Sequence, residues 1–371
     1  MKTNNYLWSM LVTATFVLTG CGSDENGITD PLPQGKTAQL ELCLTGSGVN
    51  TKATGSALPT QAEENTVKRF TVAIFNSDES VNAIQTVTDN TTSATTINCT
   101  PATNCTGIVV ANAPTDGYFS GVLNKTDFLK KTITLDDAQT KDCLPMSGDV
   151  KDGSGNATFT LSAGSNTGMT AQLSRLVARV SVSSIKTAFD PNGQYSAASY
   201  ELKKIFVRNA VKEAVPGTSG YSTTKMETPA YLTGTYTGSS GTAAYLANAV
   251  TPGVDVSTEH KTDYWFYILP NEETTHTALV LEGTFKKNAS DAGSTIYYPI
   301  IVNKSQTGTT LTGTAGTGTS NIARNTTYAI KATIKNIGTD DPTGEINPTS
   351  LELTVNVANW ALDITQDVTF E

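Results

Sequence analysis

Residues 175–185, RLVARVSVSSI, alternate between apolar side chains and polar or charged ones. One face of this stretch carries Leu176, Ala178, Val180 and Val182. Successive side chains of an extended strand point to opposite sides, so this pattern predicts a half-buried β-strand. The same stretch places Arg175 and Arg179 four residues apart, among the apolar positions.

The same alternation recurs along most of the chain. Further strands are predicted at 37–45, 69–76, 107–112, 157–161, 200–210, 263–269, 277–287, 296–304, 327–337, 350–360 and 361–370. One short helix is predicted around 119–131, and the Thr- and Gly-rich stretch 305–320 is interpreted as a loop. About a dozen strands with little helix predict an all-β protein of two β-sandwich domains. The segment GSNTG, residues 164–168, separates two groups of strands and suggests a boundary near 165–172.

The composition agrees with this fold class. The chain has 371 residues, which favours two domains over one. It contains 63 threonines and 30 glycines, whereas only 16% of its residues are charged. Threonine is β-branched and favours strands. The net charge of −9 argues against a nucleic-acid partner, since such proteins carry a basic patch.

The N-terminus has the pattern of an exported lipoprotein. Lys2 precedes the apolar run 6–18, which is shorter than the roughly 20 residues that a membrane-spanning helix needs. The run ends in Leu18-Thr19-Gly20-Cys21, the order of a bacterial lipoprotein box, in which the cysteine thiol takes the lipid. We therefore expect lipidation at Cys21. The polar residues that follow are interpreted as a tether between the membrane and the folded body.

Cys43, Cys99, Cys105 and Cys143 remain. An exported protein meets an oxidising environment, where disulfides form. Cys99 and Cys105 bracket the turn-like TPATN, so a local disulfide between them is predicted; free or differently paired thiols are the alternative. With only two histidines and no C-x-x-C, the sequence argues against a zinc site.

No catalytic pattern stands out. The chain has no nucleophile elbow, zinc-protease helix, phosphate loop or dinucleotide fingerprint. Its two histidines, His260 and His276, lie in segments interpreted as solvated loops. We therefore predict no enzymatic activity, no catalytic residue, no cofactor and no metal site.

Several short segments together resemble the FimA-type fimbrillins, the major stalk subunits of type V pili in Gram-negative anaerobes of the Bacteroidales type. The segments are the lipoprotein box, 70–76, 109–112, 175–180, 203–206, 231–234, 266–269, 283–288, 297–303, 322–325 with Tyr328, and 357–360. No single segment is diagnostic, but their order and spacing over nearly the whole chain make the resemblance specific.

The resemblance implies two transthyretin-like β-sandwich domains and maturation by an Arg- or Lys-specific protease. The implied parts are a signal peptide at 1–20, a lipidated propeptide with a removable first strand at 21–52, an N-terminal sandwich at 53–170 and a C-terminal sandwich at 171–371. In such a subunit the protease removes the lipidated segment and the first strand. The groove that opens is filled by a neighbour's C-terminal strand, which adds main-chain hydrogen bonds and side-chain anchors.

Specific residues fit these roles. The removable strand carries Leu40, Leu42 and Leu44 on one face, and by position the cleaved bond is Lys52-Ala53, with Lys68 or Arg69 as alternatives. The donor strand is predicted at about 361–371. Its apolar face carries Leu362, Ile364, Val368 and Phe370, interrupted by Gln366.

These features predict a structural stalk subunit that is first an outer-membrane lipoprotein and then part of a cell-surface fimbrium used for adhesion. Its expected partners are neighbouring pilin subunits, accessory tip and anchor subunits, and the maturation protease; the host or bacterial surface ligand is unknown. The alternatives are a tip or anchor subunit of the same pilus, or a monomeric lipoprotein that binds glycans. A glycan binder needs exposed aromatic residues, and the only dense aromatic run, 264–267, alternates like a core strand.

Overall fold

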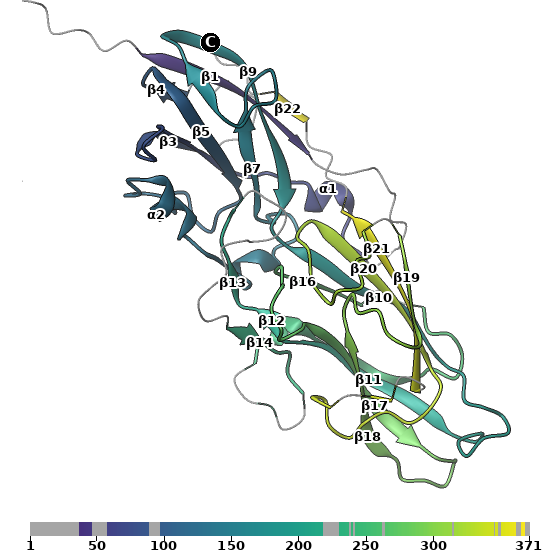
Figure 1. The fold of residues 1–371 in the computed structure, drawn as a ribbon. Coiled ribbons are helices and arrows are strands. Elements are labelled where there is room, and N and C mark those ends of the chain that lie inside the picture. Colours follow the sequence, from purple (N-terminus) through teal and green to yellow (C-terminus); the bar gives the residue numbers. More distant parts are fainter. Residues whose placement is uncertain are drawn as a thin grey trace, which may run out of the picture. The chain divides into compact units, whose positions relative to one another are not determined.

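The structure, a computed structural model, describes residues 37–46, 58–88, 97–217, 230–236, 239, 242–261, 264–313, 315–344, 346–347, 350–360 and 365–367. All of these belong to one compact unit, Lys36–Glu371. The helices in this part of the chain are α1 (Gln61–Glu64) and α2 (Lys125–Leu129), with 3-10 turns η1 (Asp137–Gln139) and η2 (Ala244–Leu246). The remaining regular structure is strand, as the alternation predicts (Figure 1).

The first half of the chain builds a nine-stranded sheet. Its order is β22 (Thr365–Asp367), β1 (Ala38–Gly46), β9 (Gly164–Arg175), β7 (Met146–Lys151), β5 (Ala102–Ala111), β2 (Phe70–Phe75) and β3 (Val81–Val87). Two short strands lie off this path: β4 (Ile97–Cys99) pairs with β1, and β8 (Phe159–Leu161) pairs with β5. β22 is the one strand of this sheet that comes from the C-terminal end of the chain.

The second half builds two further sheets. The five-stranded sheet has the order β16 (Tyr264–Ile268), β10 (Ala178–Thr187), β20 (Thr326–Ile334), β21 (Leu351–Asn359) and β19 (Thr309–Thr312). The four-stranded sheet has the order β15 (Ala247–Asp255), β11 (Ser199–Arg208), β17 (Ala278–Lys286) and β18 (Ser294–Ile301). Two small ladders complete the fold, β12 (Ala210–Val211) with β14 (Tyr231–Leu232), and β13 (Glu213–Ala214) with β6 (Ile133–Thr134).

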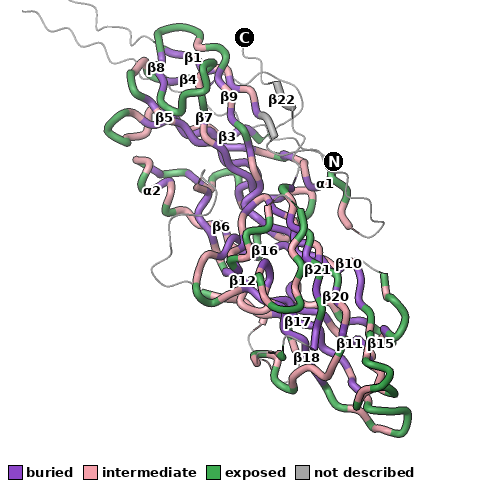
Figure 2. Tube along the Cα trace, turned by 45° about the vertical axis from the view of Figure 1, so that its right-hand side comes forward, coloured by how far each residue is buried: buried purple, intermediate pink, exposed green. Residues whose placement is uncertain are grey.

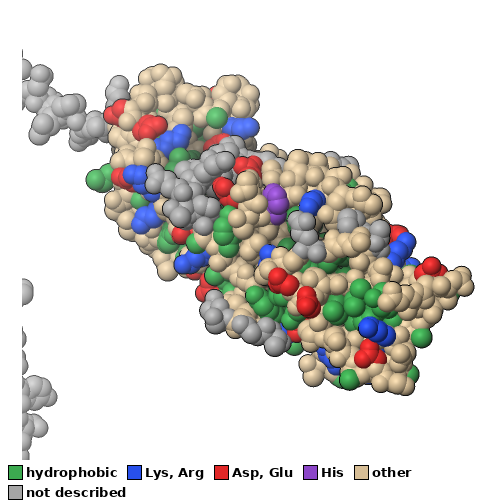
Figure 3. Space-filling view, turned by 60° about the horizontal axis from the view of Figure 1, so that its bottom comes forward, with side chains coloured by type: hydrophobic (Ala, Val, Ile, Leu, Met, Phe, Trp, Pro, Cys, Tyr) green, Lys and Arg blue, Asp and Glu red, His purple; other side chains and the backbone are tan. Residues whose placement is uncertain are grey.

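The apolar faces of these sheets form the core. In β21, Leu351, Leu353, Val355 and Val357 are buried while the residues between them are exposed, which is the predicted alternation. Figure 2 shows the same contrast, with buried strands and exposed connecting loops. On the face drawn in Figure 3, uncharged polar side chains and backbone dominate, and hydrophobic side chains gather along its lower part between scattered charges. The prediction of a mostly β protein with two β-rich domains is confirmed.

Three local predictions differ from the structure. The segment interpreted as a domain boundary, 164–168, is the start of β9, where backbone pairing with β1 compensates for its weak strand propensity. Asn166 adds a side-chain hydrogen bond of 3.2 Å to the Gln39 carbonyl. The stretch 175–185 is also not one strand: β9 ends at Arg175 and β10 begins at Ala178, so the chain passes from one sheet to the next between them. The helix predicted around 119–131 is limited to α2.

Candidate subunit-assembly site

Strand β1 is buried along one face. Ala38, Leu40 and Leu44 are 0% exposed and Leu42 is 1% exposed, whereas the intervening Gln39 and other intervening residues are partly exposed. This follows from the period of two in a strand, which directs alternate side chains into the core. Burying three leucine side chains contributes roughly 4.5–9 kcal/mol as an upper estimate. The apolar face predicted for the first strand is therefore a core face of the nine-stranded sheet.

β1 has hydrogen-bonded neighbours on both sides. It runs parallel to β9, with Leu42 opposite Met169 and Leu44 opposite Ala171. On its other edge it pairs antiparallel with β4 near Ala38 and with β22 near Cys43. Figure 1 shows β1, in purple, alongside the yellow β22. Withdrawal of β1 would uncover the edge of β9 and an apolar strip of the core, which together form a template for another strand.

Helix α1 follows in the chain and starts with a defined cap. The Thr60 side chain accepts a hydrogen bond from the Glu63 amide, and the Glu63 carboxylate accepts one from the Thr60 amide at 2.9 Å. This is the reciprocal capping box that the order Thr-x-x-Glu favours. The helix ends at Glu64, whose side chain is turned into the interior.

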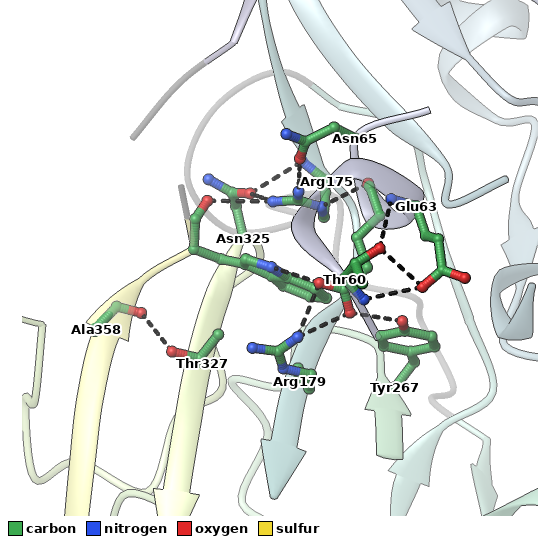
Figure 4. Close-up of polar contacts among 11 residues, drawn as sticks. Thr60, Glu63, Asn65, Arg175, Arg179, Tyr267, Asn325, Thr327 and Ala358 are labelled. Carbon is green, nitrogen blue, oxygen red and sulfur yellow. Dashed lines mark hydrogen bonds and ion pairs between the residues drawn. The ribbon is translucent and has the colours of Figure 1, made fainter. Parts of the chain in front are cut away.

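Glu64 is a buried carboxylate with three side-chain donors. The Arg179 Nη1 lies 2.8 Å from each of its oxygens, the Tyr267 hydroxyl donates to Oε1 at 2.7 Å and the Trp360 indole N–H donates to Oε2 at 3.2 Å. Glu64 is 1% exposed and Arg179 is 5% exposed. Figure 4 shows the side chains of Arg179 and Tyr267 pointing toward one another beside α1. The contact joins α1 to β10, β16 and the end of β21.

Arg175 binds backbone carbonyls next to this carboxylate. We refer to the five residues together as the Glu64 cluster: Glu64, Arg175, Arg179, Tyr267 and Trp360. The Arg175 Nε donates to the Glu64 carbonyl at 3.1 Å and its Nη1 to the Trp360 carbonyl at 3.2 Å. The guanidinium carbons of Arg175 and Arg179 lie 4.3 and 4.8 Å from the centroid of the Trp360 ring. Cations over an indole ring are attracted by its π electrons, more strongly when water is excluded.

Burial affects the acid–base properties of the cluster. It lowers the pKa of Arg175 to about 10, against the opposing effect of the Glu64 charge, so Arg175 remains a cation at neutral pH. Burial first, and then the Glu64 charge, raise the pKa of Tyr267, which stays a neutral donor. A carboxylate paired with one cation, Arg179, and held by two neutral donors in a buried site is costly to disrupt, because any remaining charge would be unpaired.

Two family models match the chain. The model described as major fimbrial subunit protein (FimA) matches residues 38–175, and the FimA4 pilin C-terminal domain matches residues 178–360.

The chain belongs to the FimA family of major fimbrial subunits.

Individual relatives agree with this assignment. The chain is 25% identical to the major fimbrium subunit FimA type-5 of Porphyromonas gingivalis over 399 aligned residues, which cover 95% of this chain and 96% of the relative. A solved fimbrilin (FimA) from P. gingivalis W83 has a TM-score of 0.64 at 19% identity and covers 88% of this chain and 99% of that one. A putative cell adhesion protein from Bacteroides eggerthii has a TM-score of 0.63 at 24% identity, covering 89% and 98%.

The FimA assignment confirms the predicted family and the predicted function class. The chain is a structural fimbrial subunit of a cell-surface fimbrium and has no enzymatic role. The matched ranges also coincide with landmarks of the fold. The first begins where β1 begins and ends at Arg175; the second begins where β10 begins and ends at Trp360. The Glu64 cluster therefore lies where these two FimA ranges meet.

Several predicted site residues lie outside the described residues. These are Cys21, Lys52, Ala53, Leu362, Ile364, Val368 and Phe370. Leu40, Leu42 and Leu44 are the predicted residues that the structure brings together, and the backbone of 365–367 lies beside them as β22. Within the described part of the chain, no helix is long and apolar enough to cross a membrane.

The predicted disulfide between Cys99 and Cys105 is not formed in the structure, where both residues are reduced and buried. TPATN does not hold them as a closed pair: Cys99 ends β4 opposite Ala38 of β1, whereas Cys105 lies in β5 opposite Phe159 of β8. Burial and the neighbouring Cys105 raise the pKa of the Cys99 thiol to about 12.

Sequence reasoning missed Glu64 and Trp360 as partners of the two arginines. A signal was present: Arg175 and Arg179 interrupt an apolar stretch, and a buried arginine needs acceptors. The capping box at Thr60 also marked α1. The partner of each arginine could not be identified, because Glu64 is separated from Arg179 by 115 residues in the chain.

Proposed function

We propose that this FimA-family chain is a stalk-type subunit of a type V pilus that is exported as a lipoprotein, matured by proteolysis and polymerised by donor-strand exchange for adhesion. The observation that carries the proposal is β1, an N-terminal strand with a fully buried apolar face and hydrogen-bonded neighbours on both edges. Such a strand leaves a deep apolar groove when it is removed. A groove of this kind on each subunit accounts for growth of a filament by head-to-tail contacts.

The predicted cleavage bond stands at a suitable place in the chain. Lys52-Ala53 lies between the end of β1 at Gly46 and the start of α1 at Gln61. A cut there leaves β1 attached to the body only by non-covalent contacts. The body itself keeps its new N-terminal region in place, because Glu64 at the end of α1 is anchored in the buried cluster.

The C-terminal segment suits the role of donor. It follows Trp360, whose indole and carbonyl are both held in the Glu64 cluster, so the residue that precedes the segment is fixed in the body. Four apolar residues at even spacing, Leu362, Ile364, Val368 and Phe370, would replace the four of β1. In the precursor, 365–367 pair with β1 itself. Loss of β1 would therefore open the groove and also release the donor from its partner.

The alternative roles for this chain predict different experimental results. An anchor subunit would resist cleavage and keep its lipid, and a tip subunit would accept a donor without supplying one. A monomeric glycan-binding lipoprotein would neither mature nor polymerise. The partners implied by the stalk role are identical neighbouring subunits, accessory tip and anchor subunits, and an Arg- or Lys-specific protease.

The first test is cleavage of the precursor that begins at residue 21, with Cys21→Ser to prevent lipidation. A lysine-specific protease should yield a new N-terminus at Ala53 and a ladder of SDS-resistant species on a gel of unheated sample. Lys52→Ala should abolish both, whereas Lys151→Ala, at an exposed position in β7, should abolish neither. A stable, uncut monomer would contradict the stalk role, and cleavage at Ala53 without a ladder would contradict the donor assignment.

Cys99 should report the departure of β1. Its raised pKa and its burial keep the thiolate rare, so iodoacetamide should label it slowly in the precursor. In a chain that ends at Trp360, so that no donor refills the groove, cleavage should raise the rate of labelling by about tenfold or more. Peptide mass spectrometry measures the rate, with the half-buried Cys143 as the internal control. Equal rates for Cys99 before and after cleavage would mean that β1 stays in place.

A further inference from the structure

A cavity of ≈ 310 Å³ lies outside the assembly site, where η1, η2, β15 and β16 come together. Its lining residues are Gln139, Tyr245, Asn248, Tyr264, Trp265 and Phe266. Three of the four aromatic residues, Tyr245, Tyr264 and Trp265, are partly exposed, so the aromatic run of β16 is not entirely a core strand. The volume is at the low end of the range for small-molecule sites and suits a single ring.

Several polar groups of this cavity are available to a ligand, whereas the Tyr264 hydroxyl is paired with the His260 Nε2 at 3.1 Å. The Gln139 amide is oriented by donation from its Nε2 to the Leu135 carbonyl at 2.8 Å, which leaves its own carbonyl oxygen as an acceptor. The Asn248 amide, the Tyr245 hydroxyl and the Trp265 indole N–H make no hydrogen bond to other described residues. The lining therefore offers both donors and acceptors beside aromatic rings.

This combination of aromatic rings with hydrogen-bond donors and acceptors favours some classes of ligand over others. A pyranose sugar has an apolar face of C–H groups that can lie on an aromatic ring, and hydroxyls that both donate and accept hydrogen bonds. A quaternary ammonium ion would leave the indole N–H and the amide donors without acceptors. Asp136 and Asp137 lie close enough to Tyr245 that their charges, after burial, raise the pKa of its hydroxyl. Their negative charge disfavours anionic sugars.

From these observations, we infer that the cavity lined by Tyr245, Asn248, Tyr264 and Trp265 is a binding site for one neutral pyranose residue, such as the terminal sugar of a surface glycan. One such contact is weak, with a dissociation constant expected in the millimolar range for a ligand of about twelve heavy atoms. The part of the inference that concerns adhesion rests on the proposed polymer, because repetition of a weak site along a filament raises the avidity for a multivalent surface.

The test uses the uncleaved precursor beginning at residue 21 with Cys21→Ser, so that its outcome does not depend on polymerisation. The probes are the methyl glycosides of galactose, mannose and N-acetylglucosamine, with N-acetylneuraminic acid and choline as charged probes. Saturation-transfer NMR and indole fluorescence measure binding. We expect at least one neutral glycoside to bind, and neither charged probe to do so.

Variants locate the site. Trp265→Ala and Tyr245→Ala should each weaken binding by about tenfold or more, Trp265→Phe should weaken it less, and Tyr231→Ala, outside the cavity, should leave it unchanged. Trp265→Phe keeps a ring in β16 and guards against misfolding of the alanine variant. The inference is overturned if no neutral glycoside binds at about 50 mM, if choline binds instead, or if binding is indifferent to Trp265→Phe and Tyr245→Ala. None of these results would affect the proposal of strand exchange, whose own test is the SDS-resistant ladder.

Discussion

Replacement of Glu64 by alanine should lower the free energy of unfolding by about 3–5 kcal/mol, because it leaves buried Arg179 without its carboxylate. The variant also removes the acceptor of the Tyr267 hydroxyl and of the Trp360 indole N–H. Urea unfolding of the uncleaved precursor, followed by tryptophan fluorescence, measures the change. Because the proposed donor segment follows Trp360 in the chain, the cleaved variant should also form the SDS-resistant ladder more slowly, at a temperature where it remains folded.

Two control variants test whether the loss of stability is specific to Glu64 or follows the removal of any carboxylate. Glu272 has no side-chain hydrogen bond or ion pair within the described residues, so Glu272→Ala should be nearly neutral. In the double variant Glu64→Gln/Arg179→Met neither charge of the Glu64–Arg179 pair remains, and stability should recover in part relative to Glu64→Ala. If Glu64→Ala is no more destabilising than Glu272→Ala, the cluster does not hold α1 and the end of β21 together.

Replacement of Leu42 by aspartate should release β1 without any protease. The side chain is 1% exposed, so the change removes its apolar burial and places a carboxylate in the core, a combined cost of more than about 4 kcal/mol. If the occupied groove is what prevents assembly, the uncut Leu42→Asp precursor should already form SDS-resistant species. Size-exclusion chromatography and an unheated gel measure this against the wild-type precursor.

The segment that the proposed cleavage would remove provides an internal control for this experiment. Cleavage after Lys52 would remove residue 42, so the matured variant has the same sequence as matured wild type and should polymerise equally well. Gln39→Asp, on the opposite face of β1, should leave the precursor monomeric. A Leu42→Asp precursor that stays monomeric with an unchanged melting temperature would show that β1 does not control assembly.

The alternation of apolar and polar side chains was enough to predict the sheets. It identified β1, β2, β11, β16, β17, β20 and β21 as strands. The period of two that buries one face of a strand is visible in the amino-acid sequence itself. It also identified the apolar face of β1, whose three leucines all lie in the core. The alternation failed at GSNTG, because a strand with little apolar content is stabilised by its neighbours' backbones.

The predicted disulfide is not formed in the structure, although the Cys105 thiol is near enough to affect the pKa of the Cys99 thiol. Short separation in sequence brings Cys99 and Cys105 into one region, but each thiol follows the strand that carries it, and the two strands pair with different neighbours. A disulfide depends on the geometry of both residues, which separation in sequence does not determine.

The sequence by itself determined the fold class, the family resemblance and the apolar face of β1, since each depends on local order along the chain. Only the tertiary structure decided that β1 lies between β9 and the C-terminal β22, and that Glu64 meets Arg179, Tyr267 and Trp360. These contacts join residues more than a hundred positions apart; Glu64 and Trp360 are 296 positions apart in the chain. These contacts form because the sheets bury their apolar faces against one another. That packing brings polar groups from distant parts of the chain close enough to hydrogen-bond to one another.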